Sequence, residues 1–329
     1  MAGSGVAHLR KNENSVLAVE NMVVEFPVGR GQTVHAVSNI SFDLLQGETL
    51  GIVGESGCGK STAGRAVMQL PAPKSGSVEI DGIELTTLSA SALRKIRAQM
   101  QMIMQDPISS LNPRRKVKHL VTEGPRMWGQ RNNEWLDRSG RNLLQSVGLD
   151  PDMVWERLPS ELSGGQCQRV CIARAMMLRP KVLICDEPVS SLDVSVQAQI
   201  LNLLEQAKAE FELTMIFIAH NMAVVKNISD RVMVMYLGKV CEIAPSREME
   251  RLALHPYTQL LLASIPDPDI LRSESEAVPL IEGDLPSPLD PPSGCRFRTR
   301  CPLVTDRCTA EEPLLREIAE GHYVACHNI

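Results

Sequence analysis

The feature that most limits the fold of this chain is a glycine-rich stretch at residues 54–61, with the sequence GESGCGKS. It fits G-x-x-x-x-G-K-[ST], the Walker A pattern of a phosphate-binding loop. The apolar run at 48–54 predicts a buried strand before the loop, and residues 62–70 predict a helix after it. Because such a loop and helix start gather backbone N–H groups around phosphate oxygens, we expect nucleotide binding. Lys60 would then reach the β- and γ-phosphates, and Ser61 would ligate Mg²⁺.

A second apolar run, residues 182–185, ends in the adjacent carboxylates Asp186 and Glu187 and is followed by Pro188. A buried parallel strand presents functional groups at its C-terminal end, beside the phosphate loop. Adjacent carboxylates are also common on exposed turns, but the apolar run and the proline favour the functional alternative. We expect Asp186 to hold the hydration shell of Mg²⁺ and Glu187 to orient and deprotonate an attacking water.

A third motif, LSGGQ at residues 162–166, precedes a segment whose apolar side chains recur at roughly helical spacing up to residue 178. Ser163, Gly164 and Gly165 also make an ordinary helix cap, so they are weak evidence by themselves. Their N–H groups nevertheless form an anion site, in a chain that already has one complete phosphate site. Two phosphate-facing surfaces predict that the second serves the nucleotide of a partner subunit.

The composition argues against several other functions. The net charge is −5 and aromatic residues make up 3% of the chain, so neither a basic field nor a base-stacking platform for nucleic acid is expected. The apolar runs fall well short of the ~18 residues that suggest a membrane span. Residues 1–15 are polar and lack the apolar core of a signal peptide, which predicts a disordered lead.

The pattern along the chain predicts a nucleotide-binding domain at 16–264, containing a helical subdomain at about 106–161. A disordered lead at 1–15 precedes this domain. A linker at 265–294 follows it, because that stretch is rich in proline, aspartate and serine. The chain then ends in a compact, cysteine-rich tail at 295–329.

Four of the nine cysteines lie in this tail, at Cys295, Cys301, Cys308 and Cys326. A disulfide is disfavoured if the protein works where ATP is cytosolic. Structural zinc sites generally use closer cysteine pairs than this C-x5-C-x6-C-x17-C spacing, so an iron–sulfur cluster, zinc and unligated thiols all stay open. The alternating Arg296, Arg298 and Arg300 predict a solvated face, or charges that offset an anionic cluster.

Taken together, these motifs resemble the ATP-binding subunit of an ABC transporter from about residue 17 onward. The resemblance implies an α/β fold: a P-loop NTPase (RecA-like) core with an antiparallel β subdomain, an inserted helical subdomain and a small Cys-rich C-terminal extension. It implies that Gln105 links Mg²⁺ and water to the helical subdomain, and that His220 contacts the γ-phosphate and the catalytic water. It also places a D-loop at 191–193 and an adenine-stacking aromatic residue at Phe26, although a strand-end phenylalanine is also common in cores.

Within that superfamily the chain resembles the oligopeptide/dipeptide importer ATPases, and their F-type member in particular. The stretches that carry the likeness to these importers are QDPISSLNPR at 105–114, DEPVSSLDVSVQAQILNLL at 186–204, HPYTQLLLASIP at 255–266 and PPSGCRFRTRCP at 291–302. The likeness to the F-type member is carried by CGKST at 58–62 and NPR at 112–114. The chain departs from the family pattern at Cys167, at Asn221 and at residues 158–160. None of these positions is assigned to chemistry.

The resemblance implies a transport-coupled ATPase that energises import of di- or oligopeptides through a membrane permease, by ATP-driven closure of an ATPase dimer. The implied partners are a second ABC ATPase subunit, two transmembrane permease subunits and an extracytoplasmic solute-binding protein, with no nucleic acid. The implied location is the cytoplasmic face of the inner membrane, as a peripheral subunit. The implied cofactors are ATP, Mg²⁺ and a [4Fe-4S] cluster in the tail, with zinc as the alternative. A different small solute such as nickel or glutathione, or a soluble non-transport ABC ATPase, remains an alternative function.

The expected catalytic residues are Glu187, His220 and Gln105. The expected nucleotide-binding residues are Phe26, Gly54, Glu55, Ser56, Gly57, Cys58, Gly59, Lys60, Ser61, Thr62, Gln105, Asp186, Ser163, Gly164, Gly165, Gln166 and Asp193. The expected Mg²⁺ ligands are Ser61, Gln105 and Asp186, and the expected cluster ligands are Cys295, Cys301, Cys308 and Cys326.

Overall fold

The computed structural model describes residues 8–10, 15–29, 31–190, 192–265 and 284–329. The chain forms two compact units, one built from residues 1–87 and 217–329 and the other from residues 88–216. The second unit is therefore an insertion between two parts of the first. Most of the predicted lead at 1–15 and much of the predicted linker at 265–294 lie outside the described residues.

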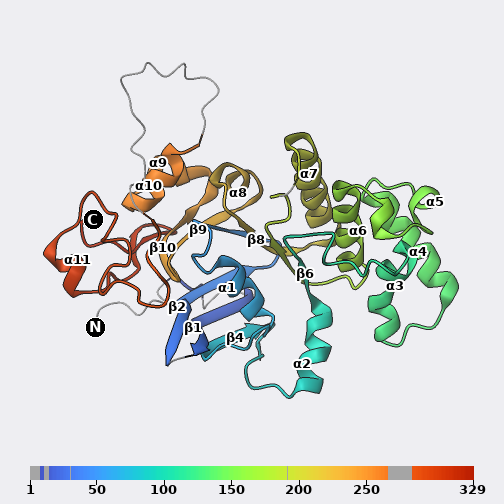
Figure 1. The fold of residues 1–329 in the computed structure, drawn as a ribbon, viewed down its shortest axis with the longest axis horizontal. Helices are drawn as coiled ribbons and strands as arrows, with labels where there is room; N and C mark the ends of the chain where they lie inside the picture. The colour runs from blue at the N-terminus through green and yellow to red at the C-terminus, as the bar shows by residue number, and fades with distance from the viewer. Residues whose placement is uncertain (1–7, 11–14, 30, 191, 266–283) are drawn as a thin grey trace. The chain divides into compact units, whose positions relative to one another are not determined.

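The first unit contains an antiparallel sheet in the order β2-β1-β4-β5. Its strands are β1 (Ser15–Gly29), β2 (Gln32–Leu45), β4 (Ser75–Ile80) and β5 (Ile83–Glu84). Along β1 the buried side chains are Leu17, Val19, Met22 and Val24. Each half of the strand follows the period of two expected of a sheet with one covered face, and the period breaks between Val19 and Met22, where the pairing with β2 shifts register. The predicted antiparallel β subdomain is confirmed (Figure 1).

The first unit also contains the parallel pair β3 (Thr49–Val53) and β9 (Arg231–Tyr236). Strand β10 (Lys239–Pro245) pairs antiparallel with β9 and with β12 (His322–Val324), which pairs in turn with β11 (Arg316–Ala319). The tail thus extends the core sheet, as the red segment beside β10 shows in Figure 1.

The helices of the first unit are α1 (Lys60–Val67), α8 (Met222–Ile228), α9 (Met249–Leu252), α10 (Pro256–Ala263) and α11 (Asp306–Ala310), with a 3-10 turn at Ser246–Glu248. Helix α8 packs closely on β3 at Gly51. A Cβ atom there would lie 2.2 Å from Val225 Cγ1, so glycine permits this approach. Strand β8 (Thr214–Ala219) lies where the chain passes from the second unit into the first.

The second unit holds the parallel pair β6 (Met100–Ile103) and β7 (Val182–Asp186) together with most of the helices. These helices are α2 (Ala90–Ile96), α3 (Val117–Met127), α4 (Asn133–Ser146), α5 (Pro151–Val154), α6 (Gly164–Met176) and α7 (Val194–Phe211), with 3-10 turns at Arg97–Gln99 and Pro159–Glu161. Helices α3, α4 and α6 pack together around buried leucine and valine side chains such as Leu120, Leu144 and Val170. Across the described parts of the chain, no helix is both long and apolar enough to cross a membrane.

Candidate functional site

The phosphate loop, residues 54–61, connects the fully buried strand β3 to helix α1. Gly54 and Gly59 have φ angles of 157° and 102°. A Cβ atom at Gly54 would lie 2.1 Å from the carbonyl oxygen of Met235, and one at Gly59 would lie 2.1 Å from that of Ala36. Only glycine fits these two positions, so the loop's curl depends on them.

Lys60 begins helix α1 and is buried, with 4% of its surface exposed. Its Nζ donates hydrogen bonds to the carbonyl oxygens of Gly54, at 2.7 Å, and Glu55, at 3.0 Å. The loop therefore curls around an ammonium group, which is the charge that a polyphosphate requires. Ser61 and Thr62 follow at intermediate exposure.

The middle of the loop differs in exposure from residue to residue. Ser56 and Gly57 are exposed, whereas Cys58 is fully buried. Burial raises the pKa of the Cys58 thiol, which keeps it protonated and unreactive near neutral pH. Cys58 therefore acts as a small apolar side chain under the loop.

In the second unit, β7 is buried along its whole length and ends at Asp186, which is fully buried. Glu187 follows with a φ of 48°, a left-handed conformation that a glutamate rarely adopts. Gln105 lies just after β6 and donates a hydrogen bond from its Nε2 to Glu187 Oε2 at 2.9 Å. Two of the three expected catalytic side chains are thus in contact, at the C-terminal ends of adjacent parallel strands.

The signature loop, residues 162–166, lies at the start of α6. Ser163 Oγ accepts a hydrogen bond from the Gln166 N–H at 3.3 Å, and Gln166 Oε1 accepts one from the Ser163 N–H at 2.9 Å. This capping box holds the backbone of Gly164 and Gly165 in place. Ser163 therefore caps helix α6, as the cap pattern in the sequence predicts.

The remaining expected residues lie at the ends of elements. Asp193 precedes α7, while Ser191 of the expected D-loop lies outside the described residues. His220 is exposed directly after β8, and Asn221 caps α8 by accepting a hydrogen bond from the Ala223 N–H at 2.8 Å. Phe26 on β1 is 36% exposed, so the core alternative for this side chain is wrong.

Sequence reasoning missed two residues that hold the phosphate loop. The Tyr257 hydroxyl of α10 accepts a hydrogen bond from the Glu55 N–H at 2.8 Å. Arg300 of the tail forms an ion pair with the Glu55 carboxylate at 2.8 Å. The HPYTQ stretch containing Tyr257 is noticeable only as a family likeness, and nothing local in the sequence links Arg300 to the loop.

The arginines of the tail correct another expectation. Arg296 donates hydrogen bonds to the carbonyl oxygen of Leu237 and, at 2.9 Å, to Ser38 Oγ, and the Arg300 side chain is only 7% exposed. The hypothesis of a solvated arginine face is therefore wrong for these two residues, because each has acceptors in the core of the unit.

The structure does not show the metal centre that the sequence suggested for the tail cysteines. Among the residues that the structure describes, no group of three or more His, Cys, Asp or Glu side chains is placed to hold a metal ion. Burial is the main reason that the pKa of Cys295 is raised to about 11, and it also raises the pKa of Cys301 and of Cys326. A raised pKa favours the thiol over the thiolate, and the thiolate is the form in which cysteine binds a metal. The structure therefore does not support the predicted cluster or zinc site.

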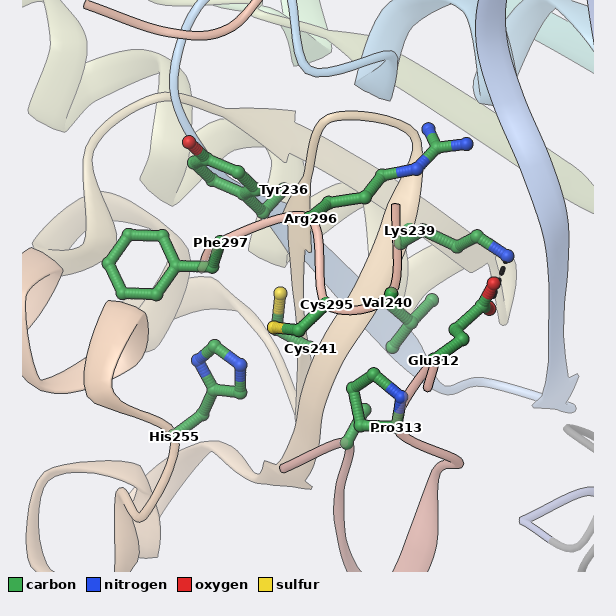
Figure 2. A pocket seen from close by; sticks show the side chains of 12 residues that line it. Tyr236, Lys239, Val240, Cys241, His255, Cys295, Arg296, Phe297, Glu312 and Pro313 are labelled. Carbon is green, nitrogen blue, oxygen red and sulfur yellow. Dashed lines mark hydrogen bonds and ion pairs between the residues drawn. The ribbon is translucent and has the colours of Figure 1, made fainter. Parts of the chain in front are cut away.

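A small cavity of about 40 Å³ lies where the tail meets β9 and β10 (Figure 2). Its lining includes Cys241, His255, Cys295 and Phe297, and the ring of Phe297 lies 5.1 Å from that of Tyr236. Burial lowers the pKa of His255 to about 4, so this imidazole is neutral near pH 7. At this volume the cavity can hold a few water molecules, and it is far smaller than the pockets that bind nucleotide-sized ligands.

Two family models match the chain. One, described as "ABC transporter", matches residues 37–190, and one described as "Oligopeptide/dipeptide transporter, C-terminal region" matches residues 241–308. The oligopeptide transport ATP-binding protein AppF of Bacillus subtilis is 45% identical to this chain, and the match covers 96% of this chain and 98% of AppF.

Solved structures agree with these matches. CbiO1 from Clostridium perfringens, part of the ABC transporter complex CbiONQ, matches with a TM-score of 0.64 and 28% identity over 72% of this chain and 90% of that one. The ATP-binding cassette MJ0796, in a dimeric post-hydrolysis state bound to ADP and phosphate, matches with a TM-score of 0.65 and 27% identity over 70% of this chain and 99% of that one.

Proposed function

Because this chain belongs to the ATP-binding proteins of oligopeptide and dipeptide ABC transporters, we propose that it energises the import of peptides by hydrolysing ATP. The chain is an ABC-type ATPase. The single observation that carries the proposal for its site is the phosphate loop curled around the buried ammonium of Lys60. Lys60 neutralises the β- and γ-phosphates and Ser61 ligates Mg²⁺, while Phe26 stacks on the adenine ring.

Hydrolysis is assigned to the residues at the ends of β6, β7 and β8. Asp186 holds the hydration shell of Mg²⁺, Glu187 accepts a proton from the attacking water, and His220 contacts the γ-phosphate and that water. Gln105 orients the Glu187 carboxylate, and the 2.9 Å hydrogen bond between them supports this assignment. The left-handed backbone of Glu187 supports it further, since strained residues concentrate at functional sites.

Replacing Glu187 with glutamine tests the assignment. Glu187→Gln should bind ATP like the wild type and lose steady turnover by at least about a hundredfold, because the amide cannot accept the proton. Phosphate release and ATP binding would be measured on the same preparation. The exposed Glu205 on α7 offers a matched control, and Glu205→Gln should keep full turnover. Normal turnover by Glu187→Gln would remove Glu187 from the base role.

The signature loop is assigned to the nucleotide bound by a second ATPase subunit. Ser163 and Gly165 contact the γ-phosphate across the interface when the pair closes, and hydrolysis releases them. The dimeric state described for MJ0796 supports this arrangement. The closing motion passes to two membrane permease subunits, which hold the ATPase pair at the cytoplasmic face of the membrane and receive solute from an extracytoplasmic binding protein.

The cargo is assigned as di- or oligopeptides, because AppF is described as an oligopeptide transport protein and the C-terminal family model carries the same description. Nickel or glutathione is the alternative cargo. Uptake assays in cells lacking this chain decide between them. Loss of peptide uptake alone supports the assignment, and loss of nickel or glutathione uptake contradicts it.

A [4Fe-4S] cluster in the tail rests on donor chemistry alone, since four cysteine thiolates are the usual ligand set of such a cluster. Cys295, Cys301, Cys308 and Cys326 would hold it, and it would contribute to the folding of the tail. Iron and acid-labile sulfide in anaerobically purified protein would support the cluster. Zinc in their place would favour the alternative, and the absence of all three would leave the thiols unligated.

A further inference from the structure

The tail makes a direct contact with the phosphate loop. Arg300 Nη1 donates hydrogen bonds to both carboxylate oxygens of Glu55, at 3.1 and 2.8 Å. The two residues are 245 positions apart, yet both belong to the same compact unit. The Arg300 side chain is 7% exposed and that of Glu55 is 25% exposed, so solvent screens this pair less than an ordinary surface pair.

The surroundings of Arg300 hold its guanidinium group in one place. The group lies over the ring of Tyr236, 5.8 Å from its centroid, and donates to the Tyr236 hydroxyl at 3.4 Å. Three residues earlier, Phe297 packs against the rings of both Tyr236 and Tyr257. Figure 2 shows two of these rings, Phe297 and Tyr236. The cluster is formed by strand β9, helix α10 and the tail together.

Two groups from outside the loop therefore hold Glu55 in place. Its backbone N–H donates to the Tyr257 hydroxyl at 2.8 Å, and its carboxylate accepts from Arg300. The carbonyl oxygen of the same residue accepts from Lys60 at 3.0 Å, so Glu55 adjoins the ammonium group assigned to the phosphates. An uncompensated carboxylate at this point would repel a polyphosphate and compete for Lys60.

We propose that Arg300 is a positioning residue that neutralises and immobilises Glu55, so that docking of the tail sets the affinity of the phosphate loop for ATP. This inference rests on the proposed role of the loop in ATP binding. Arg300 acts through Glu55 and is not itself a ligand of ATP. The tail thereby has a function at the nucleotide site that does not depend on whether its cysteines bind a metal.

The test is a double-mutant cycle on the full-length protein. The Kd for a fluorescent N-methylanthraniloyl ATP analogue is measured by titration in the presence of Mg²⁺. Arg300→Gln should raise the Kd about tenfold, because it leaves the Glu55 charge unopposed. Glu55→Gln is the reference for the double variant Glu55→Gln/Arg300→Gln: in that background the loss of Arg300 should raise the Kd by less than about threefold, since the repelling charge is gone. Arg300→Lys keeps the charge and should raise the Kd by less than about threefold. In turnover assays Arg300→Gln should raise KM and leave kcat nearly unchanged.

Three controls distinguish a failure of this proposal from a failure of the loop's role in ATP binding and from misfolding of a variant. Arg307→Gln removes an exposed tail arginine that pairs with Glu311, and it should change nothing. Lys60→Ala should abolish binding, and if it does not, the role of the loop fails. Should Arg300→Gln fail to fold, Arg300→Met gives a second neutral variant that keeps the packing on Tyr236. The proposal is overturned if the neutral Arg300 variant binds the ATP analogue with wild-type affinity. It is also overturned if losing Arg300 weakens binding as much in the Glu55→Gln background as in the wild type.

Discussion

At the scale of single residues, the phosphate loop shows how a local pattern fixes geometry. Gly54 was predicted from the motif, and the structure gives the reason, because its φ is 157° and a Cβ atom would meet the Met235 carbonyl oxygen. The Lys60 contacts follow from the same local pattern. The Glu55–Arg300 pair does not, because burial of an arginine depends on which distant acceptors the fold brings to it. Residue types and spacing cannot carry that information.

This reasoning leads to a prediction for Gly54→Ala. The added methyl group must displace the Met235 carbonyl or the loop, so we expect the loss of ATP binding and of about 1–3 kcal/mol of stability. ATP titration and thermal unfolding measure the two effects. Gly82 is a matched control, since its φ is 74° and a Cβ atom there meets nothing within 4 Å. Gly82→Ala should cost some stability from its backbone conformation and leave ATP binding intact. ATP binding by Gly54→Ala at wild-type affinity would contradict the steric argument.

At the scale of elements, the strands and helices that flank the motifs were the most predictable. Strand β3, strand β7 and the start of α6 lie where their apolar runs and the serine cap place them. The pairing of β12 with β10 was not predicted. Strand β12 is only three residues long and gains its partner from tertiary contacts, so no periodicity marks it.

The observed role of Ser163 as a helix cap and its proposed role as a contact for a partner's nucleotide can be separated by substitution. Ser163→Asp keeps a good cap for α6 and adds negative charge, so stability should stay near wild type while turnover falls by at least about tenfold. Ser163→Ala loses the cap and should cost about 1 kcal/mol of stability. Chemical denaturation and ATPase assays on the assembled dimer provide the readouts. Full turnover by Ser163→Asp would show that the loop faces no phosphate.

At the scale of the whole molecule, the tail is the part that sequence reasoning understood least. A compact cysteine-rich tail was expected after a linker, and the described tail residues share one compact unit with the phosphate loop. Their attachment uses a strand pairing, buried arginines and an aromatic cluster. Each of these contacts joins residues far apart in the chain, so the spacing of the cysteines could not predict this packing.

Glu242 is a buried residue that holds the tail to β10. It is fully buried on β10, where its carboxylate accepts hydrogen bonds from the N–H groups of Leu254 and His255 and lies 2.7 Å from His322 Nε2 in the tail. Glu242→Ala leaves those groups buried without their acceptor, and we expect a loss of about 3–5 kcal/mol. Thermal unfolding should show this loss, and limited proteolysis should show earlier cleavage within the tail.

The pair of Lys239 and Glu312 gives the contrast, because it also joins β10 to the tail but its carboxylate side chain is 53% exposed. Glu312→Gln should change stability by no more than about 0.5 kcal/mol. If the tail also tunes the phosphate loop, Glu242→Ala should weaken ATP binding at temperatures where the rest of the unit is still folded, and Glu312→Gln should not. Equal stability of the two variants would mean that the buried carboxylate does not anchor the tail.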